Sequence, residues 1–117
     1  MGLSTHVLDT MHGTPAAGMA VALYTTQDGH ATLLQRLVLN VDGRNPAGAL
    51  IATPDLRVGT YRLEFDVADY FKARGVDLPE PPFLERVCLD FGVADVTRHY
   101  HVPLLVSPWS YSTYRGS

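Results

Sequence analysis

This sequence of 117 residues has a single cysteine, no long apolar run and no cluster of basic residues. With only Cys88 present, no disulfide can form within the chain, and we read its thiol as a small buried hydrophobe. No window approaches the ~20 apolar residues of a membrane-spanning helix. The nine Lys and Arg residues are scattered and the formal net charge is -3, which argues against a nucleic-acid-binding surface.

The start of the chain also lacks the basic stretch and apolar run of a signal peptide. We therefore expect a cytoplasmic protein that has neither nucleic acid nor a membrane as its partner. The length suits a single domain over residues 1–117, because a chain of this size buries roughly two-thirds of its unfolded surface.

What the sequence does contain is strand patterning. In residues 60–67 apolar and polar side chains alternate, which places Tyr61, Leu63, Phe65 and Val67 inward. Weaker patterns of the same kind predict strands at 3–8, 19–25, 32–39, 83–91, 100–106 and 110–114, with turns at 13–15, 27–29, 42–43 and 45–46. Seven or eight such strands predict an all-β, antiparallel sandwich, and the count alone leaves immunoglobulin-like sandwiches open.

One segment departs from strand patterning. Asp69 is a good N-cap, good helix formers follow it, and Gly75 stands where a C-cap would lie, which predicts a single short helix. The prolines at 79, 81 and 82 then predict an extended connection to the next strand.

Histidine is the residue type with the most evident chemistry, and the chain has five, at positions 6, 12, 30, 99 and 101. On an alternating strand His99, His101 and Pro103 share one face, while the residues at 100, 102 and 104 share the other. If the second set forms the core, both histidines face solvent or an interface. An imidazole with a pKa near its usual value of about 6.5 can act as a general base at physiological pH, although a single histidine is more often structural.

The last nine residues combine three aromatics, an arginine and several hydroxyl groups in an alternating pattern that suits a strand. Most chains end in a dispensable tail, but this terminus is patterned like a strand, and we therefore expect it to have a function. A tag added after Ser117 should then damage activity more than a tag before Met1. Ser117 carries both its hydroxyl and the terminal carboxylate. Arg44 follows the turn residues Asp42 and Gly43, where an arginine is usually a solvated surface charge.

Four runs together carry a resemblance to a known family. They are LSTHVLD at 3–9 followed by GTPA at 13–16, DGR at 42–44, HYHVPLL at 99–105, and the closing YRGS at 114–117. In this order they resemble the 5-hydroxyisourate hydrolases, the transthyretin-related enzymes. The resemblance implies a transthyretin-like β-sandwich and a cytoplasmic hydrolase of purine metabolism that converts 5-hydroxyisourate to 2-oxo-4-hydroxy-4-carboxy-5-ureidoimidazoline in urate degradation. It also implies a homotetramer, a dimer of dimers with its sites at the dimer–dimer interface.

The resemblance also implies roles for individual residues. The catalytic residues would be His6, Arg44, His101 and Ser117, and the substrate would be bound by His6, Arg44, Tyr114, Arg115, Gly116 and Ser117. Two histidines would bind and deprotonate a water molecule, a guanidinium would stabilise the oxyanion, and the terminal serine would position the substrate. Which histidine takes the proton stays open, and Gly116 would allow the backbone to approach the ligand closely.

Two other kinds of chemistry are weaker readings of the same residues. His6, His99 and His101 offer three nitrogen ligands, so zinc could bind there adventitiously, but we expect neither a metal nor an organic cofactor to be required. A nucleophilic serine is disfavoured, because the chain has no Gly-x-Ser-x-Gly run and neither Ser107 nor Ser110 has an evident triad.

The alternative function is a transthyretin-like carrier that holds a small molecule without catalysis. Both proteins would be tetrameric sandwiches, so the fold cannot separate them. A carrier needs an apolar channel, whereas His6, Arg44, His101 and the closing tetrapeptide give a polar, titratable one. The enzyme is therefore the favoured reading.

Overall fold

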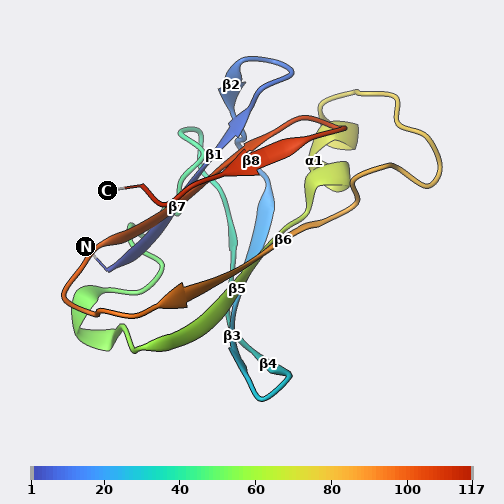
Figure 1. The fold of residues 1–117 in the computed structure, drawn as a ribbon. Coiled ribbons are helices and arrows are strands. Elements are labelled where there is room, and N and C mark those ends of the chain that lie inside the picture. The colour runs from blue at the N-terminus through green and yellow to red at the C-terminus, as the bar shows by residue number, and fades with distance from the viewer. Residues whose placement is uncertain (1, 117) are drawn as a thin grey trace.

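A computed structural model describes residues 2–116, which form two four-stranded sheets packed into a sandwich (Figure 1). One sheet has the order β2-β1-β7-β8 and the other β4-β3-β5-β6. The strands are β1 (Leu3–Asp9), β2 (Thr14–Pro15), β3 (Ala20–Gln27), β4 (His30–Val38), β5 (Gly59–Phe65), β6 (Val87–Val93), β7 (Tyr100–Val106) and β8 (Tyr111–Thr113). A 3-10 turn, η1 (Thr53–Asp55), and one helix, α1 (Val67–Ala73), complete the elements. The predicted all-β sandwich is confirmed.

The two sheets bury one shared hydrophobic core, and strand alternation decides which residues enter it. Tyr61, Leu63 and Phe65 of β5 are almost fully buried, as their period of two predicts. On β7 the core takes Tyr100, Val102, Leu104 and Val106 in the same way. The intervening residues of β1 and β7 therefore lie on the outer face of the first sheet.

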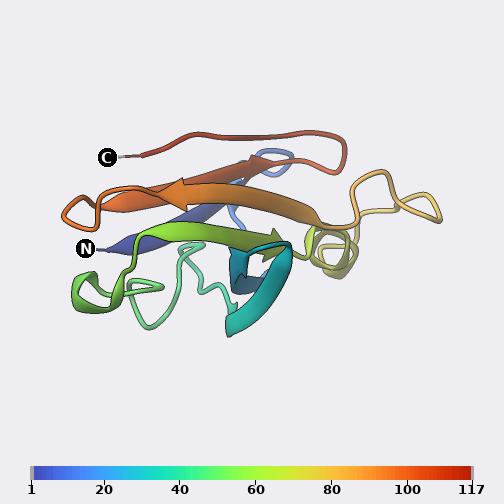
Figure 2. The same ribbon diagram turned by 60° about the horizontal axis from the view of Figure 1, so that its bottom comes forward.

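One strand pair differs from the predicted antiparallel arrangement. β1 and β7 run parallel, with Leu3 opposite Tyr100 and Asp9 opposite Val106. The whole second sheet intervenes between these strands in the sequence, and a parallel pair requires such a long crossover. The parallel register brings the start of the chain beside its last third. Figure 2 shows the N-terminal and C-terminal ends of the described chain at the same end of the molecule.

The predicted helix exists, but its predicted start was wrong. It begins at Val67, with Asp66 at the N-cap position, so that Asp69 lies in the first turn. Val67 is fully buried and fits both the strand period of two and the helical spacing of Tyr70 and Phe71, so alternation assigned it to the strand. The predicted end is confirmed, because Gly75 adopts a φ of 82° directly after the C-cap.

Two further expectations on β6 were wrong. The strand starts at Val87 rather than at residue 83, because its partner β5 ends at Phe65, opposite Val87, and residues 83–86 have no strand beside them. Cys88 is exposed rather than buried, since β6 directs Val87 and Leu89 to the core and Cys88 to the outside.

A buried carboxylate joins the first sheet to the helix. Asp9, at the end of β1, is 1 % exposed and accepts hydrogen bonds from the backbone N–H of His12 (2.9 Å) and from the Tyr70 hydroxyl (2.7 Å). Its other contacts are Nδ1 of His12 at 2.6 Å and the Arg74 guanidinium at 3.5 Å.

Neither helix in residues 2–116 is long and apolar enough to cross a membrane.

Candidate functional site

The outer face of β1 and β7 brings together polar side chains from opposite ends of the sequence. The parallel register sets Ser4 opposite His101 and His6 opposite Pro103. Because Leu3, Thr5 and Val7 point into the core, the residues between them share the face that His101 occupies. The prediction that His99 and His101 lie away from the core is confirmed, although the neighbouring Pro103 is itself buried.

Ser4 lies between the two histidines of β7. Its Oγ is 2.8 Å from Nδ1 of His101 and 3.3 Å from Nε2 of His99. The two imidazoles stack at 6.4 Å between ring centroids, with an interplanar angle of 11°. Within residues 2–116, the buried Nδ1 of His99 has no hydrogen-bond partner.

Arg44 reaches the same face through backbone pairing, since it forms an isolated antiparallel bridge with His6. Oδ1 of Asn40 shapes the loop by accepting from the backbone N–H groups of Asp42 (2.9 Å) and Arg44 (3.1 Å). The carbonyl of Gly43 then accepts from the backbone N–H of Val7 at 2.9 Å. A Cβ at Gly43 would lie 2.5 Å from the Val7 carbonyl oxygen, and its φ is 71°, so glycine is required where this loop joins β1.

Both histidines facing Arg44 have pKa values below the usual one. Burial is the main cause of the lowered pKa of His6, and the positive charge of Arg44 adds to it against the opposing effect of a backbone hydrogen bond at Asp42. Burial also lowers the pKa of His101, followed by the charges of Arg44, His99 and His6. Both imidazoles are therefore neutral at neutral pH, the form in which they accept a proton.

The last described residues close one side of this face. Gly116 forms a bridge with His101, donating its backbone N–H to the His101 carbonyl at 2.8 Å. A Cβ at this glycine would lie 2.7 Å from Cδ2 of His101, so the backbone at Gly116 lies close to the histidine ring. Arg115 stacks over the Tyr100 ring at 4.3 Å, while Tyr114 is 61 % exposed. Ser117 lies outside the described residues.

An open pocket of about 340 Å³ adjoins the site and is lined by Arg98, His99, Arg115 and Gly116. Its lining is strongly basic, which suits an oxygen-rich or anionic ligand. Within residues 2–116, no three His, Cys, Asp or Glu side chains are arranged to hold a metal ion, so the possible zinc set of His6, His99 and His101 is not assembled. His99 and His101 instead each direct a ring nitrogen to Ser4.

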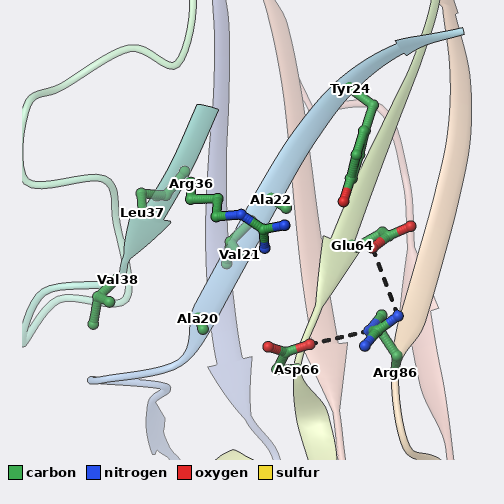
Figure 3. Close-up of a pocket in the computed structure, with 10 residues that line it drawn as sticks. All are labelled: Ala20, Val21, Ala22, Tyr24, Arg36, Leu37, Val38, Glu64, Asp66 and Arg86. Atoms are coloured by element: carbon green, nitrogen blue, oxygen red, sulfur yellow. Dashed lines mark hydrogen bonds and ion pairs between the residues drawn. The ribbon is translucent and has the colours of Figure 1, made fainter. Parts of the chain in front are cut away.

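A second hollow, of about 390 Å³, lies on the outer face of the other sheet (Figure 3). Its acidic side chains are neutralised, because Arg86 pairs with Asp66 at 3.1 Å and with Glu64 at 3.8 Å. Arg36 and Tyr24 complete its polar lining, and no histidine or hydroxyl nucleophile paired with a base is among the lining residues. This hollow therefore lacks the groups that acid–base chemistry needs.

Sequence reasoning missed three members of the site: Ser4, Asn40 and Asp42. A signal for Ser4 was available, because it precedes His6 by two residues on a predicted strand and must share its face. The roles of Asn40 and Asp42 depend on the path of a loop, which has no periodicity to reveal it.

Comparisons with known sequences all match the chain to the same family. The sequence model of the HIUase/Transthyretin family matches residues 3–116. A 5-hydroxyisourate hydrolase of Deinococcus radiodurans is 53% identical over 99% of this chain and 96% of its own length. One of Pseudomonas aeruginosa is 50% identical over 98% of this chain and 90% of its own.

Solved structures with the same fold include proteins of different activity. The structure of Klebsiella pneumoniae 5-hydroxyisourate hydrolase has a TM-score of 0.78 at 36% identity, covering all of both chains. Sea bream transthyretin in complex with thyroxine has a TM-score of 0.85 at 32% identity, over 99% of this chain and 95% of its own. (S)-Allantoin synthase has a TM-score of 0.93 at 42% identity, and the match covers 99% of this chain but 43% of that one.

Proposed function

This chain belongs to the HIUase/Transthyretin family, and on that premise we propose that it hydrolyses 5-hydroxyisourate with water activated beside His6 and His101. The reaction is that of relatives named 5-hydroxyisourate hydrolase, which are about half identical and match it over nearly their whole length. The observation that supports the residue roles is the meeting of two histidines of lowered pKa and an arginine on one sheet face.

The chemistry requires a base and a group that stabilises negative charge. The water oxygen forms a bond to a ring carbonyl carbon as a histidine takes one of its protons, and the carbonyl oxygen becomes an oxyanion. When the tetrahedral intermediate collapses, the ring C–N bond breaks, the nitrogen takes up a proton and a carboxylate remains. Every atom of the product comes from the substrate and one water molecule.

Each polar residue of the face has a role in this scheme. His6 and His101, neutral at neutral pH, hold and deprotonate the water. Arg44 faces the oxyanion, because a guanidinium presents several N–H donors to a planar, oxygen-rich ring. Tyr114, Arg115 and Gly116 contact the substrate beside the basic pocket, and Ser117 positions it.

A homotetramer, a dimer of dimers whose dimers meet over this face, would complete the site. In a single chain Arg44 is exposed, Ser4, His6 and His101 are half-buried, and the adjoining pocket is open. Trp109, Tyr111 and Tyr114, in and around β8, are 56%, 45% and 61% exposed, which favours burial against another copy. We further propose a cytoplasmic location and a place in purine breakdown.

The carrier alternative shares the fold but not the lining. A channel for a hydrophobic ligand is lined by apolar side chains, whereas Ser4, His6, Arg44 and two further histidines line this face. The hydrolases of Deinococcus radiodurans and Pseudomonas aeruginosa are 53% and 50% identical to this chain, against 32% for sea bream transthyretin. The enzyme is therefore the better supported function.

The test is the decay of 5-hydroxyisourate generated from urate by uricase, corrected for the spontaneous reaction. We expect strong acceleration by the wild-type protein and a loss of about 10² to 10⁴ in His101→Asn, the range of a general base. His30→Asn, at an exposed histidine on β4, is the matched control and keeps full activity. A wild-type protein that does not accelerate the decay would refute the activity.

A further inference from the structure

Ser4 is the one hydroxyl that contacts two histidines in the described site, and the scheme above gives it no role. It is half-buried on β1, directly opposite His101 in the parallel register. Its Oγ lies at good hydrogen-bonding distance from Nδ1 of His101 (2.8 Å) and at a longer distance from Nε2 of His99 (3.3 Å). A hydroxyl has one hydrogen to donate and lone pairs to accept with, so it can fix both rings at once.

We propose that Ser4 is a positioning residue for the hydrolysis: it accepts a hydrogen bond from Nδ1 of His101, holds that ring in its Nδ1–H tautomer and leaves Nε2 free to take the proton from water. This inference rests on the proposed function, since it concerns the base of that reaction. It assigns to a neutral hydroxyl the orienting task that a carboxylate performs in Ser-His-Asp triads.

The hydrogens of this group can be assigned atom by atom. His101 donates from Nδ1 to Oγ of Ser4, and Ser4 donates its only hydroxyl hydrogen to Nε2 of His99. His99 then carries its own hydrogen on Nδ1, the buried atom that has no hydrogen-bond partner within residues 2–116. Reversing both bonds would put a hydrogen on Nε2 of His101 and remove its lone pair, so the bond between His101 and Ser4 must run from Nδ1–H to Oγ if His101 is the base.

Backbone structure holds the three side chains in this order. Ser4 is fixed by β1–β7 pairing, and Gly116 packs against the His101 ring from the other side. Burial, followed by the charges of Arg44, His99 and His6, lowers the pKa of His101, so the ring rests in a neutral form in which the choice of tautomer matters. Ser4 makes that choice through a single hydrogen bond.

The first measurement is the ¹⁵N NMR spectrum of the histidine rings at pH 8, with His101 and His99 assigned from single substitutions. We expect Nδ1–H on His101 in the wild type and in Ser4→Thr, which keeps the hydroxyl, and a shift toward Nε2–H in Ser4→Ala. A wild-type His101 protonated at Nε2, or a Ser4→Ala spectrum unchanged at His101, would overturn the proposal. This readout does not depend on any substrate, so it separates failure of the inference from failure of the proposed activity.

The second measurement is kinetic. Ser4→Ala is expected to lower kcat about 10- to 100-fold with little change in KM, the range seen when the partner of a functional histidine is removed, and Ser4→Thr to restore most of it. Thr5→Val is the matched control: Thr5 points into the core and donates to the Val102 carbonyl at 2.7 Å, so its loss lowers the melting temperature but not kcat. If Ser4→Ala and Thr5→Val behave alike, the role of Ser4 is only structural.

Discussion

At the scale of single residues, the positive charge of Arg44 acts on two imidazoles at once. It lowers the pKa of both His6 and His101, after burial has already done so. A histidine is a base only while it is neutral, so in the proposed mechanism this charge extends the active range of the site to lower pH. The same guanidinium is available to an oxyanion that forms on the substrate.

Arg44→Gln should therefore change the pH profile as well as the rate. Without the charge the pKa of both histidines rises, so the acidic limb of kcat/KM, which we expect below pH ~6.5 in the wild type, moves to higher pH. The plateau should also fall by about 10² to 10³, the cost of losing one oxyanion-stabilising group. Arg36→Gln, on the opposite sheet, is the control, and a profile that shifts equally in both variants would contradict the role of Arg44.

Gly116→Ala tests the contact between the C-terminal segment and His101. A methyl group there would meet the ring at 2.7 Å, so the imidazole must tilt, and we expect at least a tenfold loss of kcat/KM with the protein still folded. Gly92→Ala, where a Cβ meets nothing within 4 Å, should leave activity unchanged. Equal activity of the two variants would show that the ring has room to move.

The sequence alone could place some of these residues on the correct face of the sheet, but not others. Alternation alone placed His99 and His101 on the face away from the core, because their neighbours on β7 had to fill it. It could not place Arg44 beside His6, since a bridge between a loop and a strand follows no period. The resemblance to a known family implied that both residues belong to one site. The roles of all the site residues, including Tyr114, Arg115 and Ser117, remain predictions.

At the scale of elements, the carboxylate of Asp9 fastens the end of β1 to α1. Burial, the largest effect, raises its pKa, but hydrogen bonds from the His12 backbone, the Tyr70 hydroxyl and the His12 ring outweigh burial and lower the pKa below its usual value. A lowered folded-state pKa adds stability at pH values above the unfolded pKa. That stability is lost as the pH falls below about 3.9 through the folded value.

Tyr70→Phe removes one of these donors from a fully buried carboxylate. We expect the free energy of unfolding at pH 7 to fall by about 1–3 kcal/mol, the cost of leaving a buried acceptor without its partner, as measured by urea denaturation. Tyr24→Phe, at a half-exposed tyrosine on β3, should cost much less. The difference between the two variants should shrink as the pH falls through the lowered folded-state pKa of Asp9.

At this scale the limits of sequence reasoning are also specific. Period-two patterns found each of the long strands, but Val67 fits both the strand and the helical period, and the helix was predicted to start three residues late. The parallel pairing of β1 with β7 was missed because the residue pattern of one strand does not show whether its partner runs parallel or antiparallel.

At the scale of the whole molecule, the proposed assembly can be tested at the exposed aromatic residues around β8. Trp109, the only tryptophan, is 56 % exposed in the single chain. If copies meet over this face, acrylamide should quench its fluorescence weakly in the assembled protein and strongly on dilution below the dissociation constant. Light scattering should give a mass of four chains in the protected state, and a freely quenched tryptophan in a confirmed tetramer would place the interface elsewhere.

The parallel pairing of β1 with β7 also has a consequence for biosynthesis. Ser4 and His101 come together only when a strand made at the beginning of translation meets one made near its end. Contacts of such wide sequence separation form late and slow the folding of β proteins. A nascent chain stalled before β7 emerges from the ribosome would therefore have β3, β4 and β5 available for pairing but no active site.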